Sequence, residues 1–102
     1  MFEELIEPTK LLIGKGKCKI PIDNKDEVLK IYGEEILNKI LDLKQLFYFS
    51  DAYKIYNDKP NWDLIRQKTV QDFKNKYPTA NKELIDLFWW TYSFSLWKNG
   101  TI

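Results

Sequence analysis

Apolar residues are most regularly spaced between residues 25 and 49. Intervals of three and four place six apolar side chains on one face of an α-helix. The pattern predicts a helix over about 25–49, with Asp23 or Asn24 as its N-cap. Gly33 falls inside this helix and weakens it by about 1 kcal/mol relative to alanine. The apolar stripe consists of Leu29, Tyr32, Ile36, Ile40, Leu43 and Phe47.

The same spacing predicts a second helix over about 61–77. Asn61 precedes the first apolar position and is an N-cap candidate, and Pro78 ends the segment. The residues between these helices, 50–60, have no clear periodicity, and Asn57-Asp58-Lys59-Pro60 has the composition of a turn. The stripe of the second helix consists of Trp62, Ile65, Thr69, Phe73 and Tyr77.

A third helix is predicted over about 79–98, with Thr79 or Asn81 as its cap. Its apolar residues cover nearly the whole circumference, which is typical of a helix at the centre of a fold or one covered by a partner. Trp89 and Trp90 are adjacent, so their directions differ by about 100°. Both are buried only if the helix is covered on two sides, by other parts of this chain or by a second chain.

Residues 9–22 follow a different period. Lysines at 15, 17 and 19 alternate with Gly16, Cys18 and Ile20, which is the two-residue period of a β-strand. A turn at Lys15-Gly16 would pair the two arms of a short β-hairpin, or at least of an extended segment, with lysines on its outer face. Pro8 restricts any helix before this segment to one or two turns.

Together these patterns predict one mainly α domain over residues 1–102. Three main helices (about 25–49, 61–77 and 79–98) form a small bundle, and the hairpin or extended segment (about 9–22) adjoins it. The length of 102 residues and the composition, 44% hydrophobic and 30% charged, are those of a single folded domain.

The net charge of the chain is +1, so its overall charge does not indicate nucleic acid or an anionic membrane as a partner. The best local feature is the run from Lys10 to Lys19, which carries four lysines and no acidic residue. These lysines would contact phosphate groups or an acidic protein, or would protect an edge strand from aggregation. The acidic start of the chain, the single Cys18 and the lack of a long apolar run favour a cytoplasmic protein that does not enter the membrane.

The absence of histidine excludes much enzyme chemistry. It removes Ser-His-Asp and Cys-His catalysis and the usual zinc sites. Gly14-Lys15-Gly16-Lys17 lacks the spacing and the hydroxyl residue of a phosphate-binding loop. Carboxylates such as Glu34, Glu35 and Asp42 lie on a solvated helix face, which offers neither the burial nor the close like charge that catalytic carboxylates need. We therefore expect a protein that is not an enzyme and has no metal or cofactor, with a carboxylate enzyme as a remote alternative.

Protein binding is the class of function that remains. A small inhibitor, immunity-type or regulatory protein fits this size and composition, and a nucleic-acid-associated protein using Lys10–Lys19 is the alternative. A homodimer through the helix at 79–98 is expected if one of its tryptophans is exposed. The residues predicted to bind the partner are Lys15, Lys17, Lys19, Tyr48, Tyr53, Tyr56 and Trp62.

Overall fold

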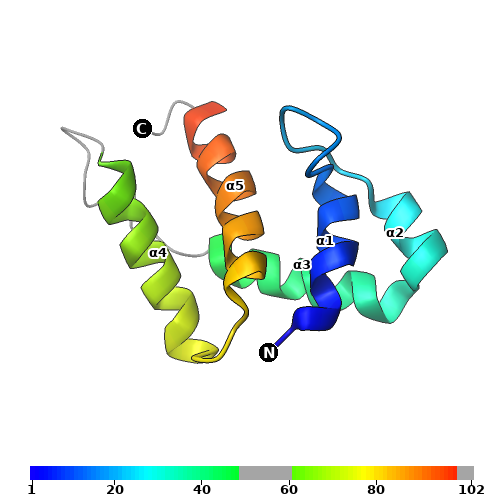
Figure 1. Cartoon of the computed structure of the whole chain (residues 1–102), viewed down its shortest axis with the longest axis horizontal. Coiled ribbons are helices and arrows are strands. Elements are labelled where there is room, and N and C mark those ends of the chain that lie inside the picture. Colours follow the sequence, from blue (N-terminus) through cyan, green and yellow to red (C-terminus); the bar gives the residue numbers. More distant parts are fainter. Residues whose placement is uncertain (49–60, 99–102) are drawn as a thin grey trace.

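The computed structural model describes residues 1–48 and 61–98. Within these ranges the chain forms five α-helices, one short 3-10 helix and no strand (Figure 1). The prediction of a mainly α fold is therefore confirmed for the described residues. In chain order the elements are η1 (Glu3–Leu5), α1 (Ile6–Ile13), α2 (Lys25–Tyr32), α3 (Glu34–Tyr48), α4 (Trp62–Lys76) and α5 (Lys82–Lys98).

Helix α5 occupies the centre of this arrangement. Figure 1 shows α4 on one side of α5 and α1 on the other, with α3 crossing behind. An aromatic cluster joins three of these helices: Phe47 of α3 lies 5.6 Å from Phe73 of α4 and 5.9 Å from Phe88 of α5, measured between ring centroids. Tyr92, one turn after Phe88, lies 5.8 Å from Phe47. The all-round apolarity of α5 is thus explained largely by helices that cover it.

Both predicted asparagine caps are present. The side-chain oxygen of Asn61 accepts hydrogen bonds from the backbone N–H groups of Asp63 and Leu64, at 3.1 and 3.2 Å. That of Asn81 accepts from Glu83 and Leu84, at 2.8 and 3.4 Å. Asn81 rather than Thr79 therefore starts α5. These bonds satisfy N–H groups that have no partner inside the helix.

The hairpin predicted over 9–22 is wrong, because α1 continues to Ile13. Pro8 lies in the first turn of α1, where a backbone N–H would have no partner within the helix, so its ring costs no hydrogen bond. Gly14 ends the helix with a φ of 75°, and the N–H of Lys15 reaches back to the carbonyl of Lys10 at 3.0 Å. The glycine is thus a helix terminator, not part of a β-turn.

The segment after Gly14 returns to cover the end of α1. The backbone N–H of Ile22 donates to the carbonyl of Ile13, and that of Asn24 to the carbonyl of Leu12, each at 3.0 Å. The side chain of Asn24 donates to the carbonyl of Leu11 at 3.3 Å. These bonds satisfy carbonyl groups that the last turn of a helix leaves free. Asn24 precedes α2, but its side chain makes no capping hydrogen bond there.

The single helix predicted over 25–49 is two helices. Gly33 has φ 92° and ψ 168°, a conformation that is essentially restricted to glycine, and it separates α2 from α3. The change of direction alters which residues are buried. In α2 the core residue is Val28, whereas Leu29 and Tyr32 of the predicted stripe are exposed. In α3 the predicted positions Ile40, Leu43 and Phe47 are buried.

The three-helix bundle is accordingly corrected to five packed helices in the described part of the chain. The C-terminal ends of α1 and α5 and the beginning of α4 lie at the same end of the molecule (Figure 1). This arrangement brings segments from residues 14–20, 62 and 89–98 to one region of the surface.

Candidate functional site

All four tryptophans of the chain line one open hollow on the surface, which we call the tryptophan groove. Its volume is about 360 Å³. One tryptophan comes from the first turn of α4 and three come from α5. The groove is lined by Trp62, Trp89, Trp90, Ser93, Phe94 and Trp97.

Helical spacing explains why α5 supplies most of this groove. Phe88 and Tyr92, four residues apart, face the core and are almost completely buried. Trp90, Phe94 and Trp97 follow one another at intervals of four and three on another face. No helix among the described residues covers that face completely. The exposed fraction of Trp97 is 66%, and that of Trp62 is 38%.

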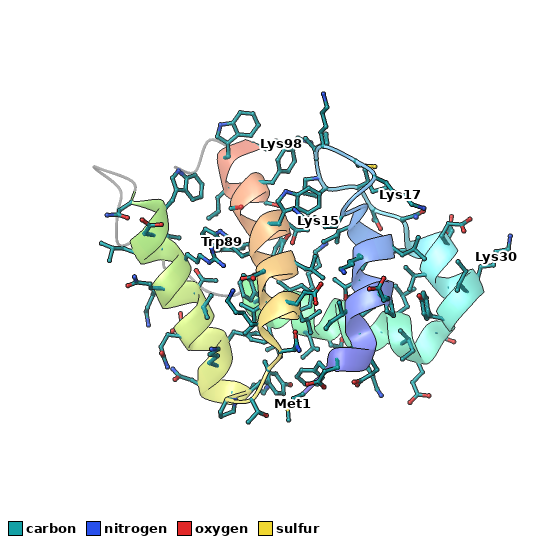
Figure 2. All side chains as sticks on the ribbon, viewed as in Figure 1. Met1, Lys15, Lys17, Lys30, Trp89 and Lys98 are labelled. Atoms are coloured by element: carbon teal, nitrogen blue, oxygen red, sulfur yellow. The ribbon has the colours of Figure 1, made fainter. Side chains whose placement is uncertain are left out.

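Ring contacts hold the aromatic walls in place. Trp62 and Trp89 meet edge to face across α4 and α5, with centroids 6.2 Å apart. Phe94 and Trp97 lie 5.9 Å apart. The Nζ atom of Lys15 lies 4.4 Å from the centroid of the Trp90 ring, a cation–π contact that joins the groove to the turn after α1. Figure 2 shows Lys15 between α1 and α5.

The groove offers apolar surface and hydrogen-bond donors but no charge. None of its lining residues is ionisable. The hydroxyl of Ser93 donates to the carbonyl of Trp90 at 3.2 Å. Over residues 1–48 and 61–98, none of the four indole N–H groups has a hydrogen-bond acceptor. An incoming ligand with apolar side chains and carbonyl oxygens would match both properties.

The predicted lysines lie on the turn that follows α1, which we call the lysine turn (residues 14–19). Lys15, Lys17 and Lys19 are exposed. Lys10 lies before the turn and forms ion pairs with Glu83 at 2.8 Å and with Glu7 at 3.3 Å. The ammonium of Lys10 donates hydrogen bonds to Glu83 and to Glu7, and these bonds, that to Glu83 first, raise the pKa of Lys10. The predicted run of four lysines therefore contains one whose charge is already paired.

The predicted aromatic residues are divided by the structure. Trp62 belongs to the groove. Tyr48 is half-buried at the edge of the core, where its ring meets Tyr92 with centroids 5.2 Å apart. Tyr53 and Tyr56 lie outside the described residues. The structure thus brings Trp62 together with the three tryptophans of α5, whose burial the sequence left open, and not with Tyr48.

Trp89, Trp90 and Trp97 are therefore the candidate site residues that the sequence analysis missed. One signal could have found them: the apolar surface of α5 extends around more of the helix than one core requires. The exposed carboxylates Glu34 and Glu35 lack the burial that catalytic carboxylates use.

Comparisons with protein-family models, with curated proteins and with solved structures found no match. Across the described ranges, no helix combines the length and the apolar character needed to cross a membrane. The same residues contain no group of three or more Cys, Asp or Glu side chains placed to hold a metal ion.

Proposed function

We propose that this chain is a small cytoplasmic protein, not an enzyme, that binds another protein through the tryptophan groove. An inhibitor, immunity-type or regulatory role fits such a protein. One observation carries the proposal: all four tryptophans converge from two helices on one open groove, and their N–H groups have no acceptor among residues 1–48 and 61–98. Tryptophan is enriched among the residues that dominate binding energy at protein interfaces.

The structure favours this role over the nucleic-acid alternative. Of the four lysines in the basic run, Lys10 is paired with two glutamates and Lys15 lies over Trp90. The only arginine, Arg66, is on α4 and pairs with Asp86. Arginine is the commonest residue in specific contacts to guanine. The groove itself, without any positive charge, does not attract phosphate groups.

The test captures partners from the native host with the full chain and with three variants. Trp62→Ala and Trp97→Ala shorten the walls of the groove. Leu64→Ala is the control, because Leu64 is an exposed apolar residue of α4 that does not line the groove. A true partner is retained by the wild type and by Leu64→Ala and is bound at least about tenfold more weakly by Trp97→Ala.

Calorimetry with the purified partner then measures each affinity directly. Equal affinity of Trp97→Ala and the wild type, or no protein retained above background, would overturn the proposal. Sedimentation of the protein alone tests the homodimer. A dimer that dissociates in Trp97→Ala would identify a second copy as the occupant of the groove.

A further inference from the structure

A second surface of different chemistry lies between the lysine turn and α2. A hollow of about 410 Å³, which we call the α2 hollow, opens there. Leu11, Ile22, Ile31 and Tyr32 supply its apolar side chains, and Lys15 and Lys17 lie at its rim. This surface is distinct from the tryptophan groove, because no residue lines both.

The outward face of α2 is unusually apolar for a helix of two turns. Only Val28 of this helix reaches the core. Leu29, Tyr32 and Ile31 are exposed, and the exposed fraction of Ile31 is 60%. Ile20, which follows the lysine turn, is 54% exposed. Of these residues, Ile31 and Tyr32 line the α2 hollow together with Leu11 and Ile22, so part of the exposed apolar surface is gathered at one site.

Hydrogen bonds fix the geometry of the hollow. The N–H groups of Lys17 and Cys18 both donate to the carbonyl of Gly14, at 3.1 and 2.9 Å. Beyond the turn, Ile22 is bonded to the end of α1. A Cβ atom on Gly14 would lie only 2.7 Å from the side chain of Ile22, so the chain is closely packed at this point. The lysines and isoleucines are therefore presented by a pre-organised backbone.

The charge around the hollow is positive. Three lysines and one glutamate line it, and the glutamate, Glu7, is paired with Lys10. Within residues 1–48 and 61–98, Lys17 and Lys19 have no ionic partner. The nearby Asp23 pairs with Lys25 at 3.4 Å. An occupant with negative charges beside the lysines would complement this rim.

We propose that the α2 hollow binds an acidic segment of a protein, with an aliphatic side chain held between aspartate or glutamate residues. The aliphatic side chain enters the hollow against Ile22 and Ile31, and the carboxylates pair with Lys17 at the rim and with Lys19 on the adjoining lysine turn. This proposal stands on the α2 hollow and does not depend on the tryptophan groove.

The shape and composition favour a peptide over two other anionic partners. A bilayer surface contacts side chains that protrude, whereas a hollow receives a side chain from an extended or helical peptide. Single-stranded nucleic acid binds through aromatic rings on which bases stack. Tyr32 is the single aromatic residue that lines the hollow.

The test begins with a selection of displayed random peptides of 12 residues against the full-length chain. Selected peptides are expected to be enriched in Asp and Glu and to contain Leu, Ile or Val. Their affinity should fall at least about tenfold in Lys17→Glu/Lys19→Glu, which reverses two charges on the lysine turn, and about fivefold in Ile31→Ala. Salt should weaken binding, because exposed charges are screened.

Matched variants separate this site from the rest of the surface. Lys74→Glu/Lys76→Glu changes the net charge equally but on the far end of α4, and it should leave peptide affinity within about twofold. Trp97→Ala should likewise leave peptide affinity within about twofold. The groove variant and the hollow variants therefore test the two proposals separately. Cys18, which lines the hollow, supplies a local signal: bound peptide should slow its modification by a thiol reagent.

Several results would overturn the proposal. These are selected peptides without acidic residues, a selection that enriches nothing, equal binding by Lys17→Glu/Lys19→Glu, or unchanged modification of Cys18. The same variants are also titrated with anionic phosphatidylserine vesicles and with an oligothymidine strand. Binding of either probe that is stronger than peptide binding and is lost in the Lys17→Glu/Lys19→Glu variant would replace the acidic peptide with that class of partner.

Discussion

The tryptophan groove and the α2 hollow lie at neighbouring positions but differ in how they are built. The groove is aromatic and uncharged, and it rests on α5, a helix of 17 residues anchored in the core. The hollow is aliphatic with a lysine rim, and it rests on α2, a helix of eight residues whose direction is set by Gly33. The contrast shows that one small chain can present an uncharged aromatic surface and a lysine-rimmed aliphatic surface on different helices.

This difference predicts different responses to salt. Binding at the groove depends on apolar contact and on neutral hydrogen bonds, so moderate salt should change it little. Binding at the hollow includes exposed ion pairs and should weaken with salt. Four experiments on variants, in order of decreasing expected effect, test how far the two surfaces are independent.

The largest loss of stability is expected from a substitution on the buried face of α5, the helix that carries the groove. Phe88→Ala removes a fully buried ring that contacts Phe47 and Phe73, and it should lower the free energy of unfolding by about 3–5 kcal/mol. Trp97→Ala, on the exposed face of α5, should lower it by less than about 1 kcal/mol. Urea unfolding measures both. Similar losses in the two variants would mean that Trp97 supports the fold as strongly as a core residue.

The second-largest change in stability is expected at Gly33, the glycine that sets the direction of α2. Gly33→Ala should lower the free energy of unfolding by about 1–3 kcal/mol, because alanine does not readily adopt φ 92° with ψ 168°. A continuous helix over 25–49 would give the opposite sign, a gain of about 1 kcal/mol. Thermal unfolding distinguishes the two outcomes. Increased stability would show that α2 and α3 are one helix and that the hollow does not have the described shape.

A smaller effect on stability is expected from the contact that links the two surfaces. The contact between Lys15 and Trp90 is worth about 0.5–1 kcal/mol at an exposed site. A double-mutant cycle with Lys15→Met and Trp90→Leu, followed by urea unfolding, should yield a coupling of that size. A coupling of zero would make the groove and the hollow energetically independent.

The smallest effect should come from Lys44, which lies between the two surfaces. A hollow there is lined by Lys44, by Ile22 from the α2 hollow and by Phe94 from the groove. Burial lowers the pKa of Lys44 below its usual 10.5, and Lys25 adds to this effect while Asp23 opposes it. The ring of Tyr48, 5.5 Å from the ammonium, attracts it only weakly at that distance.

The sign of the pH dependence follows from that lowered pKa. The folded state binds the proton of Lys44 less tightly than the unfolded state, so the cost of burying the charge is fully present below the folded pKa. Stability therefore increases as the pH rises from the folded pKa towards 10.5. Lys44→Met should be slightly more stable than the wild type at pH 7, and the difference should narrow at higher pH. Thermal unfolding at several pH values measures this difference in stability. A difference that does not change with pH would contradict the lowered pKa of Lys44.

Much of the fold followed from local patterns in the sequence. The stripes of α3 and α4 and the caps Asn61 and Asn81 rest on interactions within a few residues, so spacing alone predicted them. The segment before Gly14 was mistaken for a strand because Leu11 and Ile13 fit a period of two as well as a helix. Helical packing of Leu5, Thr9 and Leu12 against the rest of the molecule decided between these periods.

The candidate site was less predictable. Trp62 was identified from the sequence, but the burial of Trp89, Trp90 and Trp97 stayed open, because spacing does not reveal how much of a helix its neighbours cover. Likewise, the continuous stripe through Leu29 and Tyr32 assumed that the helix did not change direction at Gly33. The exposure of both residues, and with it the α2 hollow, depends on that change.

The sequence by itself determined the helical class, the positions of α4 and α5 and the absence of histidine, because these depend on residue type and short-range spacing. Only the tertiary structure decided which faces of α5 and α2 remain open. Burial is settled by contacts between helices far apart in the chain, and those contacts leave the tryptophans on one surface and the lysine-rimmed isoleucines on another.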